Sequence, residues 1–179
     1  EGLGISDKPY AICATGALLE YLHQTQKQSL SHINQVNYYT SDQYVLLDKS
    51  TRRNLELTET IRDKSKKGSL FWVLDKTSTA MGARTLRKWI EAPLRDIREI
   101  QYRLDAVEEL KNNITAREAL KELLKKVYDL ERLAGRISYG NANPRDLIAL
   151  KISLKVLPKI KEIVDSLEQF LFQKLFQDM

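Results

Sequence analysis

The fold is decided by the stretch GSLFWVLDKTSTAMGAR, residues 68–84, and by the segments on either side of it. This stretch predicts a short helix over residues 69–74 and a second helix over residues 77–90. Apolar side chains recur in the second helix at intervals of three and four residues, as one face of an α-helix requires. They are Ala80, Ala83, Leu86 and Ile90. Pro93 then stops the helix, because proline lacks an amide donor and its ring clashes with the preceding turn.

The sequence after Pro93 is predicted to stay helical. Further helix starts are predicted at Asp96, Thr115 and Asn143, where a capping side chain precedes an apolar rhythm of helical period. Pro158 is expected to kink or break the last of these helices. The expected inward-facing residues are Ile97, Ile100, Leu104, Val107 and Leu110 on the first of these helices, Leu147, Leu150, Leu154 and Leu157 on the third, and the tryptophans Trp72 and Trp89. Replacing Leu104 or Leu154 by alanine should then cost about 2 to 5 kcal/mol, as at other buried sites.

The region upstream of residue 68 has a different texture. Its β-branched and aromatic residues fall in short runs, which favours extended structure. We predict two short strands, over residues 43–48 and 55–58, joined by a turn or a single helical coil over residues 50–54. The predicted fold is therefore mainly α: a helical bundle with a small two-stranded β element near residues 43–58.

A separate amphipathic helix is predicted at the N-terminal end of the chain, from Pro9 to about Gln26. One face of it carries Ala14, Ala17, Leu18, Tyr21 and Leu22, which is the spacing of a helix with one buried stripe. The polar residues 24–31 that follow indicate a loop. This helix is therefore expected to be distinct from the bundle.

Several blocks of the sequence resemble the core domain of the MutS family of DNA mismatch-repair proteins. The blocks are LDKSTRRNLELTET at 47–60, GSLFWVLDKTSTAMGAR at 68–84, RLDAVEEL at 103–110, DLERL at 129–133 and GRISYGNANPRDL at 135–147. The resemblance implies that residues 1–30 are the end of the connector domain of such a protein. It implies that residues 31–179 are the first part of the core or lever domain, truncated at the C-terminus, where the apolar rhythm still continues.

The resemblance also implies a function. MutS-like proteins are dimeric ATPases that recognise mispaired or unpaired bases, and their core connects the ATPase to the grip on DNA. The chain would then be a structural core segment of a DNA mismatch-recognition protein, linking ATPase state to DNA binding in the full-length protein. ATP and magnesium are expected only for the full-length protein. Its implied partners are duplex DNA with mismatches, a second copy in a homodimer and a MutL-like downstream repair protein.

The residues themselves predict no catalytic, cofactor-binding or metal site. The sequence contains no Gly-x-x-x-x-Gly-Lys-Ser/Thr run, whose amides would cradle phosphates. Its soft metal ligands are Cys13, His23 and His32, too few for a zinc or a nucleophile–histidine site. We therefore expect a chain that is not an enzyme. The single cysteine and the lack of any run of roughly 18 apolar residues further predict a cytoplasmic location without membrane contact.

The net charge of +5 fits a nucleic-acid partner without requiring one. Cations without obvious acidic partners are candidate phosphate contacts: Arg52, Arg53, Lys64, Lys66 and Lys67. The structural alternative is that an arginine here pairs with Asp48 or Glu56 and pins the short strand element to the bundle, since the residues around it look like local turn and cap chemistry. The neighbouring acids Glu108 and Glu109 lie on a helix that already has an apolar face, so we expect both carboxylates to be solvated.

Two other functions stay open from the residues alone. One is an autonomous basic helical module with weak nonspecific DNA binding. The other is a self-associating interaction scaffold with an exposed apolar face made of Phe170, Leu171, Leu175 and Phe176. DNA binding that depends on salt would support the first function, and melting that depends on protein concentration would support the second.

Overall fold

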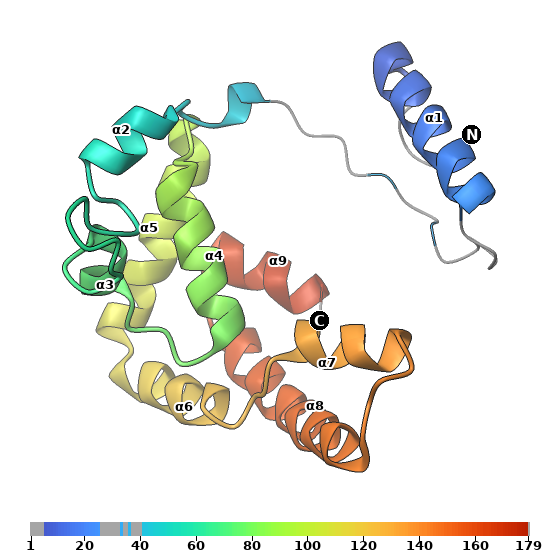
Figure 1. The fold of residues 1–179 in the computed structure, drawn as a ribbon. Coiled ribbons are helices and arrows are strands. Elements are labelled where there is room, and N and C mark those ends of the chain that lie inside the picture. The colour runs from blue at the N-terminus through green and yellow to red at the C-terminus, as the bar shows by residue number, and fades with distance from the viewer. Residues whose placement is uncertain (1–5, 26–32, 34–35, 37–40, 179) are drawn as a thin grey trace. The chain divides into compact units, whose positions relative to one another are not determined.

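The computed structural model describes residues 6–25, 33, 36 and 41–178 of the chain. The chain divides into two compact units, Glu1–Ser41 and Asp42–Met179. The first unit contains helix α1, Pro9–Thr25, which confirms the helix predicted there (Figure 1). Among the described residues, no helix combines the length and the apolarity needed to cross a bilayer.

The second unit is a bundle of helices, as predicted. A single 3-10 turn, Ser41–Gln43, precedes α2 (Lys49–Asn54), α3 (Leu70–Leu74), α4 (Ala80–Glu91), α5 (Ile97–Asn112), α6 (Ile114–Leu124), α7 (Leu130–Ser138), α8 (Pro144–Asp165) and α9 (Phe170–Asp178). Helices α2 to α8 each begin after a side chain that accepts a hydrogen bond from a backbone N–H two or three residues further on. These caps are Asp48, Ser69, Thr79, Asp96, Asn113, Asp129 and Asn143. Short polar side chains thus set where the helices start.

The core of the second unit lies where α5, α6, α8 and α9 meet (Figure 1). Helix α8 packs against α6, α7 and α9, and α5 packs against α6 and α9. The buried cluster consists of Ala106, Ala116, Val156, Ile160, Val164, Leu167 and Phe172. Because α5 and α6 contribute only alanines to this cluster, the larger side chains of α8, α9 and the turn between them fill it.

Ser153 is a fully buried polar residue on α8. Its hydroxyl donates a hydrogen bond to the Ala149 carbonyl oxygen and accepts one from Tyr128 N, both at 2.9 Å. A buried hydroxyl without partners would be costly, so both bonds are needed at this position. They tie α8 to the segment between α6 and α7.

The two-stranded β element predicted near residues 43–58 is not found; the described structure has no strand in this region. The single helical coil predicted between the two strands is confirmed as α2, because the Asp48 side chain accepts a hydrogen bond from Thr51 N and starts a helix. Glu56 then adopts a positive φ of 47°, which turns the chain and prevents an extended run at this point.

The β-type pairing described in this region is an isolated antiparallel bridge between Tyr44 and Leu94. Beside it, Val45 N donates a hydrogen bond to the Pro93 carbonyl oxygen at 2.8 Å. The β-branched and aromatic residues near position 44 therefore pair with the link between α4 and α5, far along the chain. They do not form a local hairpin.

The inward face predicted for α5 is largely wrong. Ile97, Leu104 and Val107 are 79%, 55% and 64% exposed, whereas Ala106 is buried. Leu110 does pack against the core, as predicted. Leu104 is mostly in solvent, so its burial does not support the cost of about 2 to 5 kcal/mol expected for Leu104→Ala.

The inward face predicted for α8 is also wrong in part. Leu147 and Leu154 are about half exposed, and Leu157 packs against the core. The buried residues of this helix are Ser153, Val156, Ile160 and Val164. The cost of 2 to 5 kcal/mol expected for alanine at position 154 is not supported by its burial.

Helix α8 does not end at Pro158 but continues to Asp165. Proline cannot donate a hydrogen bond to the carbonyl four residues earlier, which belongs to Leu154. Both Pro158 and Leu154 are exposed, so water can bond that carbonyl instead. The helix therefore tolerates the proline on its solvent side.

The two tryptophans are not core residues, contrary to the prediction. Trp72 on α3 is 46% exposed, while its neighbour Phe71 is buried. Trp89 on α4 is 43% exposed, and the guanidinium carbon of Arg103 lies 3.6 Å from its ring centroid. Trp89 is therefore part of a cation–π contact near the surface.

Candidate functional site

The cations predicted as phosphate contacts lie on α2 and in the loop before α3. Arg52 Nε donates a hydrogen bond to the Leu47 carbonyl oxygen at 2.9 Å. The alternative prediction, an ion pair with Asp48 or Glu56, is wrong for Arg52. Asp48 caps α2, and the Glu56 carboxylate accepts a hydrogen bond from Ile61 N at 2.7 Å. Arg52 thus fixes the entry to α2 through a backbone carbonyl.

Backbone hydrogen bonds place the lysine-rich loop beside α2. Leu70 N donates to the Glu56 carbonyl oxygen at 3.0 Å, and Phe71 N donates to the Leu57 carbonyl oxygen at 2.9 Å. The start of α3 is therefore bonded to the turn that follows α2. As a result, the loop over residues 60–68, which carries the three candidate lysines, begins and ends near this turn.

Of the three lysines, Lys66 already has a partner. Its Nζ donates to Asp75 Oδ2 at 2.6 Å, and this bond holds the pKa of the Asp75 carboxyl below its ordinary value. The side chains of Arg53, Lys64 and Lys67 are exposed, and none has an ion pair or hydrogen bond in the described part of the chain. The structure therefore brings the five candidate cations onto neighbouring segments, and among the described residues it leaves the side chains of Arg53, Lys64 and Lys67 and the terminal nitrogens of Arg52 without a partner. Phosphate binding by these residues stays a prediction.

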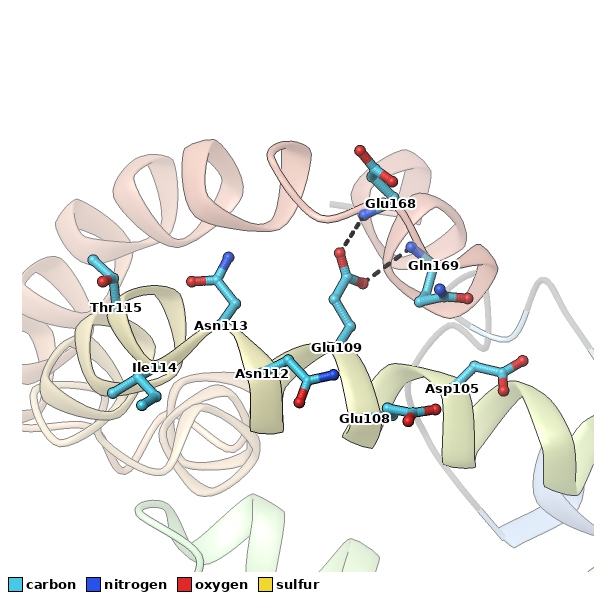
Figure 2. Close-up of a pocket in the computed structure, with 9 residues that line it drawn as sticks. All are labelled: Asp105, Glu108, Glu109, Asn112, Asn113, Ile114, Thr115, Glu168 and Gln169. Atoms are coloured by element: carbon cyan, nitrogen blue, oxygen red, sulfur yellow. Dashed lines mark hydrogen bonds between the residues drawn. The ribbon is translucent and has the colours of Figure 1, made fainter.

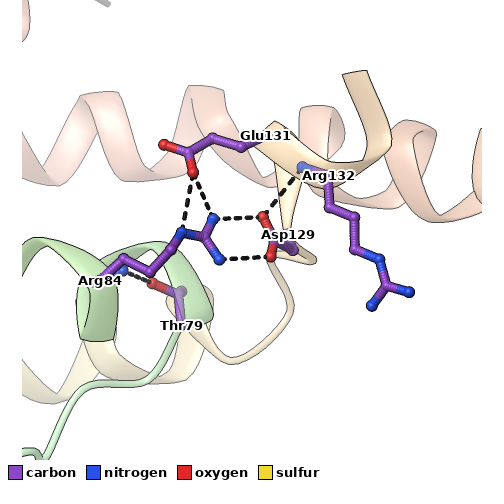
Figure 3. A network of polar contacts seen from close by, with 6 residues as sticks. Thr79, Arg84, Asp129, Glu131 and Arg132 are labelled. Carbon is purple, nitrogen blue, oxygen red and sulfur yellow. Dashed lines mark hydrogen bonds and ion pairs between the residues drawn. The ribbon is translucent and has the colours of Figure 1, made fainter. Parts of the chain in front are cut away.

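A charged network joins α4 to α7 (Figure 3). The terminal nitrogens of Arg84 donate to the two carboxylate oxygens of Asp129, both at 2.8 Å. Arg84 also donates to Glu131, from Nε at 3.1 Å and from one terminal nitrogen. Asp129 in turn caps α7 by accepting a hydrogen bond from Arg132 N at 3.3 Å. One carboxylate thus both starts a helix and holds another helix against it.

The network shifts the ionisation of both partners. The hydrogen bonds from Arg84 lower the pKa of the Asp129 carboxyl to about 2. The same bonds, with those to Glu131, raise the pKa of the Arg84 guanidinium above its ordinary value. Both groups are therefore charged at neutral pH. Because two carboxylates already surround Arg84, it acts as a structural link and not as a free phosphate contact.

We expect the contribution of the Arg84–Asp129 contact to stability to be complete above about pH 4 and to be lost as the pH falls toward 2. The pKa of Asp129 is lower in the folded chain than in the unfolded chain, so the unfolded state binds its proton first and acid favours unfolding. NMR titration of the Arg84→Met variant should return the pKa of Asp129 toward 3.8. In the control variant Arg87→Met, which breaks only the pair with Glu91 on the same helix, the pKa should stay near 2. A low pKa in Arg84→Met would contradict this account.

A second long-range contact caps α9 (Figure 2). Glu109 on α5 accepts a hydrogen bond from Glu168 N at 2.7 Å with one carboxylate oxygen, and from Gln169 N at 3.1 Å with the other. Both amides lie just before α9, where N–H groups lack helical acceptors and a negative charge is favourable. The prediction that Glu109 is solvated is therefore wrong, whereas its neighbour Glu108 is exposed as expected.

These linking residues were not recognised as such in the sequence. Asp129 has a local signal, since an acidic residue immediately before a short apolar-periodic run is a typical N-cap. Arg84 and Glu109 have no such signal, because their partners lie 45 and 59 residues away along the chain. Such contacts become visible only when the helices are placed in space.

Comparison with known proteins identifies the family. The sequence model of MutS domain III matches residues 50–178, and that of MutS domain II matches residues 1–34. The chain belongs to the MutS family. This confirms the resemblance found in its sequence blocks. The matched part of MutS domain III includes both the Arg84 network and the Glu109 cap, so both contacts are internal to that domain.

Curated MutS proteins align with the chain over its whole length. The DNA mismatch repair proteins MutS of Alkaliphilus metalliredigens, Alkaliphilus oremlandii and Lachnoclostridium phytofermentans are 59%, 56% and 51% identical over 179 residues. The chain covers 20%, 20% and 19% of these proteins. It therefore spans about one fifth of the length of the MutS relatives that it matches.

Proposed function

We propose that the chain is a structural core segment of a MutS-like DNA mismatch-recognition protein, and that it links ATPase state to DNA binding in the full-length protein. The observation that carries the proposal is the match of MutS domain III to residues 50–178. In this proposal residues 1–30 are the end of the connector domain and residues 31–179 are the first part of the core. The segment acts mechanically and has no catalytic residue of its own.

The contacts between helices support a mechanical role. Arg84 holds α4 to α7, Glu109 holds α5 to the start of α9, and Ser153 holds α8 to the segment before α7. Polar links at three separate places restrict the relative movement of the segments that they join. Helices joined in this way move as rigid elements between discrete arrangements, which is what transmission of a conformational change requires.

The other components of the proposed function belong to the full-length protein. They are ATP and magnesium as cofactors, duplex DNA with mismatches, a second copy in a homodimer, and a MutL-like downstream repair protein. The proposed location is the cytoplasm. The names of the relatives, DNA mismatch repair protein MutS, support the assignment to mismatch repair.

The test uses the full-length protein that carries this chain. Replacing Arg84 by methionine should slow the ATP-induced release of a mismatched duplex several-fold, because α4 and α7 would no longer move together. Stopped-flow fluorescence of labelled DNA measures the release rate. Duplex affinity without nucleotide and ATP hydrolysis without DNA should change little, since the proposal places both sites elsewhere.

Arg87→Met serves as the matched control, because Arg87 lies on the same helix and pairs only with Glu91 one turn away. This variant should release DNA at the unmodified rate. Equal release rates for the unmodified protein, Arg84→Met and Arg87→Met, with the folded state of each verified by melting, would refute the linking role.

A further inference from the structure

A pocket of about 370 Å³ lies between the segment before α2, the end of α4 and the middle of α5. Its walls carry the cations Arg52, Lys88 and Arg103 and the aromatic residues Tyr44 and Trp89. Its size falls within the usual range of small-ligand sites, about 300 to 1,000 Å³. The pocket is therefore large enough for a small charged ligand, and three cations and one carboxylate lie in its lining.

Two contacts fix the segments that line the pocket relative to one another. The Tyr44–Leu94 bridge fixes the segment before α2 against the link between α4 and α5. The central carbon of the Arg103 guanidinium lies 3.6 Å from the centroid of the Trp89 ring, in a cation–π contact. The cations that line the pocket therefore come from elements that are already fixed relative to one another.

The acidic residue in the lining, Glu91, does not neutralise the positive charge of the pocket. The one carboxylate in the lining, Glu91, accepts a hydrogen bond from Arg87 Nε at 2.9 Å. Lys88 and Arg103 have no hydrogen-bond acceptor or ion-pair partner in the described part of the chain, and Glu99 attracts Arg103 only at longer range. The pocket thus holds more positive charge than the nearby acids neutralise.

Arg103 makes this imbalance costly. It is half-buried, and burial lowers the pKa of its guanidinium below the ordinary value. Partly buried charges are normally paired, because a charge removed from water loses solvation that only a counter-charge restores. An anion in the pocket would supply this counter-charge.

We propose that Arg52, Lys88 and Arg103 bind a phosphate group in this pocket. A phosphate carries more than one negative charge and several acceptor oxygens, which suits three cations in the lining of one pocket better than a single carboxylate does. Arginine matches phosphate through paired N–H donors, and Arg52 keeps its two terminal nitrogens for this role while Nε bonds Leu47. The phosphate could belong to a free phosphorylated compound or to the backbone of DNA. This site is separate from the linking role proposed above.

The fluorescence of Trp89 can report binding in the pocket, because Trp89 lines it. Trp89 lies in the wall and Trp72 lies on α3, so the Trp72→Phe variant leaves the emission of Trp89 alone. Titration of this variant of the 179-residue chain with inorganic phosphate should give a saturable change in fluorescence. Sodium acetate and sodium chloride at the same ionic strength should not reproduce this change.

Variants of the lining test the assignment of residues. Lys88→Met and Arg103→Met should each raise the dissociation constant for inorganic phosphate about tenfold, equivalent to about 1.4 kcal/mol. Lys88 is exposed on α4, so its replacement should leave the fold intact even if Arg103→Met perturbs the stack on Trp89. Arg98→Met is the matched control, because Arg98 is an exposed cation on α5, the helix that carries Arg103, but does not line the pocket. It should bind phosphate as the parent does.

A short blunt duplex DNA distinguishes the two sources of phosphate. If the duplex changes the Trp89 signal and competes with inorganic phosphate, and Lys88→Met weakens both, the site takes the DNA backbone. If the phosphate response persists in the presence of excess duplex, the site takes a free phosphate group. The proposal is overturned if neither probe gives a saturable change, if acetate acts as phosphate does, or if Arg98→Met loses as much affinity as Lys88→Met.

Discussion

Replacing Leu167 by alanine should lower the free energy of unfolding of the chain by about 2 to 5 kcal/mol. Leu167 is fully buried in the turn between α8 and α9 and belongs to the core cluster with Val164 and Phe172. Its backbone is fixed as well, since its carbonyl accepts a hydrogen bond from Gln173 Nε2 at 2.6 Å. The turn therefore cannot collapse into the space that the side chain leaves, and the cavity adds to the lost burial.

Denaturation with urea, followed by circular dichroism, measures this change. Leu154→Ala is the matched control, because it removes the same atoms from a residue of α8 that is 49% exposed. We expect it to cost less than about 1 kcal/mol, as surface substitutions do. Equal losses of stability for the two variants would mean that the core does not lie at the α8–α9 turn.

Replacing Glu109 by alanine should destabilise the chain by about 1 to 3 kcal/mol, the cost of losing hydrogen bonds to a charged acceptor. Its carboxylate accepts from the backbone amides of Glu168 and Gln169, and no other side-chain acceptor bonds these amides in the described structure. The variant should therefore also loosen the start of α9. Amide hydrogen exchange at residues 168 and 169 should become faster.

Glu108→Ala provides the control for this prediction, because Glu108 is the adjacent acid on α5 and forms no hydrogen bond with the start of α9 (Figure 2). Its stability and its exchange rates at residues 168 and 169 should match those of the unmodified chain. If both glutamate variants behave alike, the cap seen in Figure 2 does not contribute to stability.

Helix starts could be predicted from the sequence because their chemistry is local. The side chain of Asp96 accepts hydrogen bonds from amides two and three residues further on, and Asn143 forms a reciprocal capping box with Asp146. Whether a residue caps a helix depends on its immediate neighbours, so the pattern carries the information. The family assignment was equally accessible, since it rests on ordered blocks of residues.

The buried face of each helix was harder to predict than its start, because burial depends on which other helix packs against it. Helix α5 has apolar residues on more than one side, and its contacts with α6 and α9 select Ala106 over Leu104. On α8, Ser153 is buried because its hydroxyl bonds Tyr128 N, a partner 25 residues away. The phosphate candidates show the same limit, since Arg52 lines a pocket with Lys88 and Arg103, which lie far from it in the sequence.

The pairing of Arg84 with two carboxylates has a consequence for how the chain exchanges ions with solution. An arginine that is already paired with Asp129 and Glu131 neutralises no phosphate of an approaching polyanion, so it releases none of the cations condensed on that polyanion. Lys66, bound to Asp75, is in the same position. The number of ions released on binding a polyanion, read from the slope of the logarithm of affinity against the logarithm of salt concentration, is therefore set by cations such as Arg53 and not by the formal net charge of +5.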